Sequence, residues 1–192
     1  MSRIAEIVTA VLQSPIPEHQ RVNGTIVLLG ETGDPVAIVA LRSYLTSANA
    51  MLRLEAAAAL IRNNDMSGMP IAESVFLGDR SGLPETSVSN LRASLRQIQD
   101  PNAVPSLARL LSQADVETRR VVASAVRQMR SAEAMRLLIR AMEDPDVDVQ
   151  WEAVMGLAQA TGQLQWGPSI PAYHDNPSYY REYWRAWARN RQ

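Results

Sequence analysis

The sequence contains no cysteine and no lysine, and its 192 residues include only two histidines. Without cysteine, disulfides, thiolate metal ligands and a cysteine nucleophile are excluded. The two histidines, His19 and His174, leave little material for a histidine-rich metal site or for general-base catalysis. We therefore expect no metal, no cofactor and no set of catalytic residues, and a binding function is favoured over an enzymatic one.

Long hydrophobic runs are also missing. No apolar run approaches the roughly 18 residues that a membrane-spanning helix needs. The apolar stretch near the N-terminus is interrupted by Glu6, and no small-residue cleavage pattern of a signal peptide follows it. These features predict a cytoplasmic protein with no membrane partner.

Aromatic residues are scarce and unevenly placed. There are four tryptophans, five tyrosines and one phenylalanine, and of these only Tyr44 and Phe76 precede Trp151. Hydrophobic residues nevertheless make up 46% of the chain, which is enough for a core. Any core in the first 150 residues must therefore be aliphatic and closely packed, and the C-terminal part must be built differently.

The formal net charge of −1 conceals blocks of opposite sign. Residues 92–140 contain nine arginines and four acids, whereas residues 141–175 contain six acids and no arginine. This balance does not support extensive nucleic-acid binding, and we do not expect nucleic acid as a partner. A local basic strip remains compatible with it.

The chain contains an internal repeat. Five segments align on Leu29, Leu60, Leu95, Val126 and Leu157, with spacings of 31, 35, 31 and 31 residues. Around these positions apolar or small residues recur at i, i+4, i+7, i+8 and i+11, which predicts an amphipathic helix. Two such sets are Thr118, Val122, Ala125, Val126 and Met129, and Val149, Ala153, Gly156, Leu157 and Ala160.

A shorter helix is expected before each of these. The candidates are Ile4–Leu12, Val36–Leu45, Ile71–Leu77, Val104–Leu111 and Ala134–Met142, separated by Pro, Gly, Asp and Asn. The longer spacing of 35 coincides with an extra loop, Gly78–Pro84. Because each helix pair exposes an apolar flank that a neighbouring pair covers, we predict an all-α, right-handed α-solenoid of about five repeats over residues 1–162.

The second helices resemble those of HEAT repeats, particularly the short bacterial type. The segments AMLRLEAAAAL and VETRRVVASAV are similar to the family signature V-R-x-x-A-A-x-A-L, and DPDVDVQWEAVMGL is similar with Gln150 in place of the arginine. The resemblance covers about residues 18–162. It implies a protein–protein scaffold most often and catalysis occasionally. In the family an aspartate six positions before the arginine builds a ladder between repeats. Only Asp144 keeps this acid, opposite Gln150, so the ladder is incomplete.

In HEAT-type proteins the second helices line a concave binding face. Positions just outside the buried stripe predict that this face carries Arg96, Arg120 and Arg127, bordered by Trp151 and Met155. Arginine with tryptophan is typical of binding hot spots, and arginine pairs with carboxylates. We therefore predict a non-catalytic interaction module that binds an acidic peptide or protein. The alternative is a solvated face neutralised by acids such as Glu117 and Glu152, with Trp151 covered by the C-terminal segment.

Residues 163–192 form the aromatic C-terminal segment. Gly167-Pro168 and Ile170-Pro171 predict an extended stretch, and Asn176-Pro177 predicts the start of a final helix. Within that helix Tyr180, Tyr183, Trp184 and Trp187 share one stripe. We expect this helix to cover the open apolar end of the array, within the same domain. Binding of a partner chain or self-association by the exposed stripe is the alternative.

Two enzyme classes with HEAT-like folds remain as alternatives to a binding module. A DNA glycosylase would need a continuous basic strip and an acid close to Trp151. A phycobilin lyase-like function is suggested by the repeat type alone, which is an analogy of fold.

Overall fold

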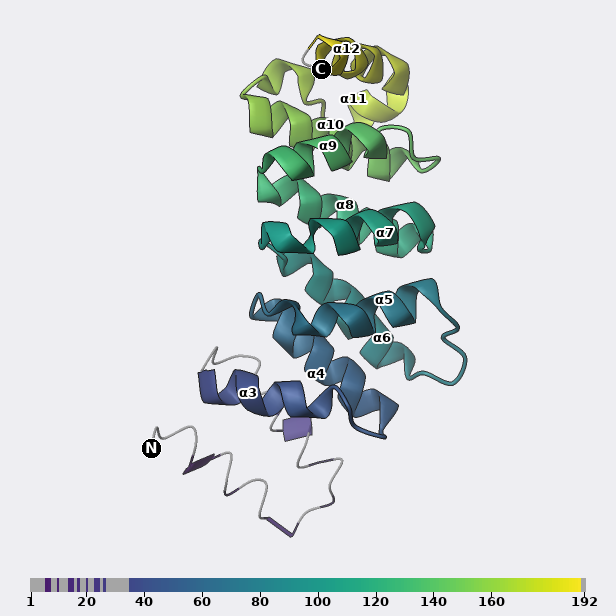
Figure 1. Cartoon of the computed structure of the whole chain (residues 1–192). Helices are drawn as coiled ribbons and strands as arrows, with labels where there is room; N and C mark the ends of the chain where they lie inside the picture. Colours follow the sequence, from purple (N-terminus) through teal and green to yellow (C-terminus); the bar gives the residue numbers. More distant parts are fainter. Residues whose placement is uncertain are drawn as a thin grey trace. The chain divides into compact units, whose positions relative to one another are not determined.

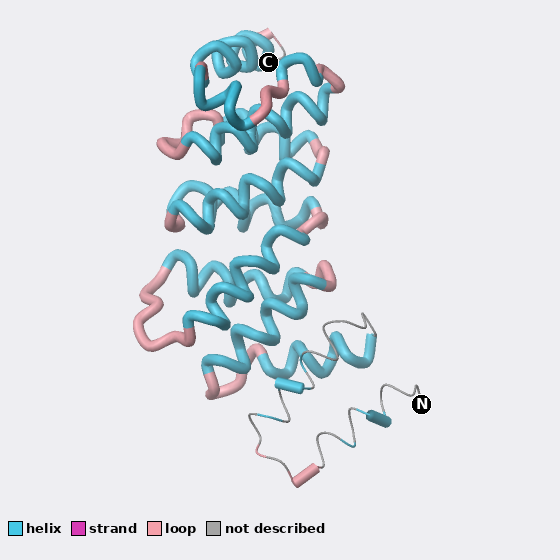
Figure 2. Tube along the Cα trace, turned by 180° about the vertical axis from the view of Figure 1, so that it is seen from behind, coloured by secondary structure: helices cyan, strands magenta, loops and turns pink. Residues whose placement is uncertain are grey.

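The computed structural model describes residues 35–190 and, before them, only the isolated positions 6, 7, 10, 14, 15, 17, 20, 23, 24 and 26. Most of the predicted helix Ile4–Leu12, together with Leu29 and His19, therefore lies outside the described residues. The chain divides into two compact units, Met1–Ile98 and Gln99–Gln192. Over the described residues all regular structure is helical (Figures 1 and 2).

From residue 35 on, the described part of the first unit contains two helix pairs. They are α3 (Pro35–Tyr44) with α4 (Ala50–Arg62), and α5 (Met69–Leu77) with α6 (Glu85–Ser94), with short 3₁₀ turns at Met66–Gly68 and Leu95–Gln97. The centre is α4, which packs against α3, α5 and α6 and buries the continuous run Ala56–Ile61. The predicted loop Gly78–Pro84 separates α5 from α6. A Cβ on Gly68 would lie 2.6 Å from the carbonyl oxygen of Ala57, so only glycine allows this close approach to α4.

The second unit contains two further pairs and the C-terminal segment. The pairs are α7 (Val104–Gln113) with α8 (Val116–Met129), and α9 (Ala132–Ala141) with α10 (Val147–Thr161). Within this unit α7 packs beside α9 and α8 beside α10, so first and second helices form two layers (Figure 1). The predicted first helices over Val36–Leu45, Ile71–Leu77, Val104–Leu111 and Ala134–Met142 are thus confirmed to within a few residues.

The buried stripe of the second helices is confirmed where it can be compared. Leu60, Leu95, Val126 and Leu157 are all completely buried, although Leu95 belongs to the 3₁₀ turn after α6 rather than to α6 itself. In α8 and α10 the stripe is buried except at its last positions, Met129 and Ala160, which are half-buried. The helical periodicity of the sequence therefore identified most of the buried positions of α8 and α10, and the aligned buried residue of each described repeat.

Small residues let the helices approach closely. A Cβ on Gly156 of α10 would lie 2.6 Å from Cδ1 of Leu138 in α9 and 3.1 Å from Cγ of Arg127 in α8. Alanines occupy neighbouring contacts, including Ala125 and Ala153, both fully buried. This explains the scarcity of aromatic residues before position 151, because a larger side chain would force the stacked helices apart.

The C-terminal segment folds back onto the last helix pair. It comprises a 3₁₀ turn at Leu164–Trp166, α11 (Ile170–Asp175) and α12 (Pro177–Arg189), and α12 packs against α10 and α9. The predicted extended stretch is only partly correct, because Pro171 stands in the first turn of the short helix α11. The predicted start of the final helix is confirmed, since the Asn176 side chain accepts a hydrogen bond from the Tyr179 N–H (3.3 Å) and Pro177 opens the helix.

The aromatic residues of α12 form the contact that covers the array. Trp184 is completely buried, and its Nε1–H donates to the carbonyl oxygen of Trp166 (3.2 Å). Trp166 in turn stacks on Tyr183, with ring centroids 3.8 Å apart. Of the predicted stripe only Trp184 is fully buried, and Tyr180, Tyr183 and Trp187 are half-buried. Among the described residues, no helix has the length and apolarity required to cross a membrane.

Candidate functional site

Four of the five predicted binding residues come together in the second unit. Arg120 and Arg127 stand on α8, and Trp151 and Met155 stand on the neighbouring α10. We call the surface formed by these four residues the second-helix face. The fifth, Arg96, lies in the first unit, where it is exposed on the 3₁₀ turn after α6. The second-helix face therefore belongs to the second unit alone.

Arg120 is held by carboxylates of the next repeat. Its Nε and Nη2 donate to the two carboxylate oxygens of Asp146 at 2.9 and 2.6 Å, and Nη2 also lies 3.1 Å from Asp148. Asp146 is the N-cap residue of α10, so one carboxylate both starts this helix and orients the guanidinium. Nη1 of Arg120 has no acceptor among the described residues, and the side chain is 46% exposed. One edge of this arginine is therefore open to solvent.

Arg127 and Trp151 form a fixed pair. The guanidinium carbon of Arg127 lies 5.3 Å from the centre of the Trp151 ring, a cation–π contact, and Nη1 lies 3.2 Å from a carboxylate oxygen of Glu152. The indole Nε1–H donates to the carbonyl oxygen of Pro168 (3.0 Å), which ties the ring to the C-terminal segment. Trp151 is consequently half-buried. The sequence allowed two alternatives, burial beneath the C-terminal segment or exposure as a binding hot spot, and the observed state is intermediate between them.

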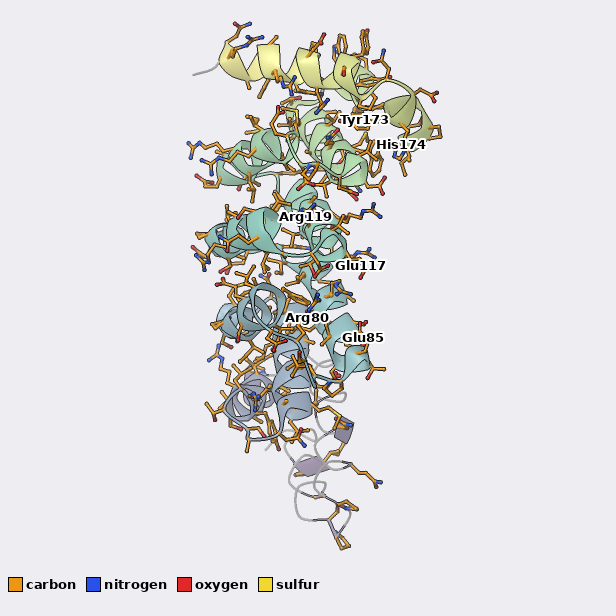
Figure 3. All side chains as sticks on the ribbon, turned by 90° about the vertical axis from the view of Figure 1, so that its right-hand side faces the viewer. Arg80, Glu85, Glu117, Arg119, Tyr173 and His174 are labelled. Carbon is orange, nitrogen blue, oxygen red and sulfur yellow. The ribbon has the colours of Figure 1, made fainter. Side chains whose placement is uncertain are left out.

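The C-terminal segment also limits the rest of this face. A Cβ on Gly167 would lie 3.0 Å from the sulfur of Met155, so the chain passes directly beside this half-buried side chain. His174 of α11 approaches from the same segment, and its Nε2 lies 3.0 Å from Oδ1 of Asp148. In Figure 3, His174 and Glu117 lie toward one side of the second unit, and Arg119 lies nearer its middle.

The charges on the second-helix face nearly cancel. The two guanidinium groups of Arg120 and Arg127 lie against three carboxylates, those of Asp146, Asp148 and Glu152. This differs from the predicted stack of open arginines and agrees with the alternative of a face neutralised by acids, among them the expected Glu152. Asp146 and Asp148, which pair with Arg120, were not expected as partners. The acids also interrupt the basic strip that a DNA glycosylase would require, so this arrangement does not favour nucleic acid.

The inter-repeat ladder is more complete than the sequence indicated. Arg119 donates from Nε and Nη2 to the two oxygens of Asp144 at 2.9 and 3.1 Å, which joins α8 to the turn before α10. In the first unit Arg53, which lacks such an acid, donates instead to the carbonyl oxygen of Ser47 (2.6 Å). The rung therefore pairs Asp144 with Arg119 of the preceding repeat, whereas the sequence pattern set Asp144 opposite Gln150 of its own repeat.

Gln150, which replaces the family's arginine, links the ladder to the C-terminal segment. Its Nε2 donates to the backbone oxygen of Asp144 (2.6 Å), and its Oε1 accepts from the Tyr173 hydroxyl (3.2 Å). An amide offers both a donor and an acceptor, whereas a guanidinium has only donors. Tyr173 is completely buried, and this burial raises the pKa of its hydroxyl to about 12. The substitution thus suits the docking of α11.

Sequence reasoning missed two adjoining grooves on the other layer of the second unit. The first has a volume of about 550 Å³ and lies along α7 and α9, and the second, of about 580 Å³, lies along α9 and α12. We call them the first-helix grooves. Arg140 and Glu143 line both of them. Nothing in the repeat pattern distinguishes Arg140 from other exposed residues of a first helix, so the sequence carries no signal for this site.

The pairing of Asp146 predicts a pH-dependent contribution to stability. The hydrogen bond from Arg120 lowers the pKa of Asp146 below its ordinary value of 3.8, against the opposing effect of burial. Because the pKa of Asp146 is lower in the folded than in the unfolded protein, its carboxylate stabilises the fold fully above the unfolded-state pKa. This stabilisation is lost as the pH falls through the folded-state pKa. Asp146→Asn should therefore lower stability by about 0.5–1 kcal/mol at pH 7. The stability of the Asp146→Asn variant should then decrease less steeply than that of the wild type as the pH falls below about 5. Urea unfolding at a series of pH values measures this, and parallel curves would contradict the assignment.

Comparisons with known proteins bear on the repeats. A family model described as HEAT repeats matches residues 89–158, a stretch that begins in α6 and ends in α10. The matched stretch therefore includes every residue of the second-helix face. A search of curated proteins found no match to the chain. Among the described residues, no three histidine, aspartate or glutamate side chains are grouped so that they could hold a metal ion.

Proposed function

We propose that this chain, which is a HEAT-repeat protein, is a non-catalytic interaction module that binds a protein or peptide segment on the second-helix face. HEAT repeats commonly serve as protein-interaction scaffolds, which supports the general class. The observation that carries the proposal is the pair of Arg127 and Trp151, fixed from both sides by Glu152 and Pro168. A preorganised aromatic and arginine pair loses little conformational entropy when a partner binds.

The chemistry of this face describes the segment that would fit. Trp151 and Met155 supply half-buried apolar surface for an apolar or aromatic side chain. The open Nη1 edge of Arg120 supplies one position for a carboxylate of the partner. Because Asp146, Asp148 and Glu152 already surround the arginines, a run of acids would be repelled. The partner segment is therefore mainly apolar with a single acidic anchor.

Affinity capture with matched variants tests this function. Met155→Glu places a charge on the second-helix face, and Met135→Glu makes the same change at a half-buried position of α9 in the other layer. Proteins captured from the source organism's lysate by the wild type should also be captured by Met135→Glu, and at least about tenfold less by Met155→Glu. Circular dichroism confirms that both variants fold. Capture of no protein, or equal capture by both variants, would contradict the proposal.

A further inference from the structure

The first-helix grooves differ in charge from the second-helix face. Their lining includes five arginines, Arg109, Arg119, Arg140, Arg185 and Arg189, and three acids, Glu143, Asp144 and Glu182. Two of these acids are already engaged. Asp144 accepts both hydrogen bonds from Arg119, and Glu143 accepts from Nε of Arg185 at 2.7 Å and from its Nη2 at 2.5 Å. The grooves therefore keep a net positive charge after these pairs are formed.

Two of the groove arginines have no such partner. Arg140, at the end of α9, and Arg189, at the end of α12, are exposed and make no hydrogen bond or ion pair with any described residue. Arg140 lines both grooves, and Arg189 lines the second. Two open guanidinium groups along neighbouring helices can each receive a carboxylate in a bidentate geometry.

Between the arginines, the groove lining is apolar. Leu111 and Leu137 line the first groove, and Ile139 and Met142 line the second. Met142 is completely buried and Leu137 nearly so, which places them at the bottom of the grooves rather than at the rim. An apolar bottom with basic side chains along it is complementary to an amphipathic segment that carries acidic residues beside apolar ones.

We propose that the first-helix grooves of the second unit bind an acidic amphipathic segment of a partner protein, with its carboxylates on Arg140 and Arg189 and its apolar side chains between α7, α9 and α12. This site is separate from the second-helix face and lies on the opposite layer of helices. The basic side chains of the grooves are complementary in charge to such a segment. A nucleic acid fits less well, because its backbone would meet Glu182 and Glu143 and would leave the apolar bottom unfilled.

Selection from a display library of random peptides of about twelve residues tests the proposal directly. The wild-type protein should enrich peptides in which Asp or Glu flank apolar residues. The selected peptides are then labelled with a fluorophore. Their affinity for the variant Arg140→Glu/Arg189→Glu should be at least about tenfold lower than for the wild type, because two attractive ion pairs become repulsive. Binding to the wild type should also weaken as NaCl is raised from about 50 to about 500 mM.

A matched control keeps the total charge change constant. Arg130→Glu/Arg136→Glu reverses two exposed arginines of the same unit, of which Arg136 is on α9 itself, and neither lines a first-helix groove. This variant should retain the peptides, and so should Met155→Glu. If Met155→Glu still binds the peptides, their site is distinct from the second-helix face. If Met155→Glu no longer binds them, the peptides bind to the second-helix face instead.

Three outcomes would overturn the proposal. The first is enrichment without acidic residues, or no enrichment at all. The second is binding that Arg140→Glu/Arg189→Glu does not change. The third is a different occupant. The chain's own residues 141–175 carry six acids, so a salt-sensitive self-association that is lost in the groove variant would identify a second copy. Salt-sensitive binding of short duplex DNA without peptide binding would identify a nucleic acid.

Discussion

Replacing Trp184 by alanine should lower the free energy of unfolding of the second unit by about 3–5 kcal/mol. The side chain is completely buried, and its ring makes T-shaped contacts with Tyr183 and Trp187 at centroid distances of 5.1 and 5.4 Å. Its Nε1–H also satisfies the carbonyl oxygen of Trp166. Removing the ring leaves a cavity between α12 and the helices it covers, and it leaves that carbonyl without its donor.

Two further variants separate the effect of the ring from that of the hydrogen bond. Trp184→Phe keeps most of the buried apolar surface and should lose about 1–3 kcal/mol. Tyr179→Ala removes an aromatic side chain of the same helix that is 53% exposed, and it should change stability by less than about 1 kcal/mol. Urea unfolding followed by circular dichroism measures all three. A Trp184→Ala variant as stable as Tyr179→Ala would show that α12 does not stabilise the last helix pair.

The fold was predictable because the pattern that encodes it is local. The stripe from Thr118 to Val126 lies within one helix, and its period alone indicates which side chains are buried. The same holds for the cap of α12, since Asn176 and Pro177 act on the turn that follows them. The short helix α11 escaped prediction because Pro171 is compatible both with an extended chain and with a helix's first turn.

The site was predictable only in part, because its charges are paired across repeats. The positions of Arg120, Arg127 and Trp151 on neighbouring helices follow from the repeat register. The partner of Arg120 does not, since Asp146 lies 26 residues after Arg120 and approaches only when the next repeat stacks. The first-helix grooves depend on how α7, α9 and α12 meet. A register taken from the second helices carries no information about that contact.

Breaking the rung between Arg119 and Asp144 is the second large effect that we expect. The two side chains are 17% and 7% exposed, and the Asp144 carboxylate also accepts the backbone N–H of Asp146 at 2.9 Å. Asp144→Ala would leave the half-buried guanidinium with the Ala114 carbonyl oxygen as its remaining acceptor. We expect a loss of about 2–4 kcal/mol, because an uncompensated charge would remain at a poorly hydrated position.

The double variant Arg119→Met/Asp144→Leu distinguishes this penalty from a net stabilisation by the ion pair. If most of the loss comes from the stranded charge, replacing both groups by apolar side chains should restore at least about half of it. Glu133→Ala provides the control, since its pair with Arg136 is 3.9 Å apart and exposed, and its loss should cost less than about 0.5 kcal/mol. Urea unfolding of the wild type and these three variants gives the stability differences that are compared. A double variant less stable than Asp144→Ala would instead show that the ion pair itself contributes most of the stability at this junction between repeats.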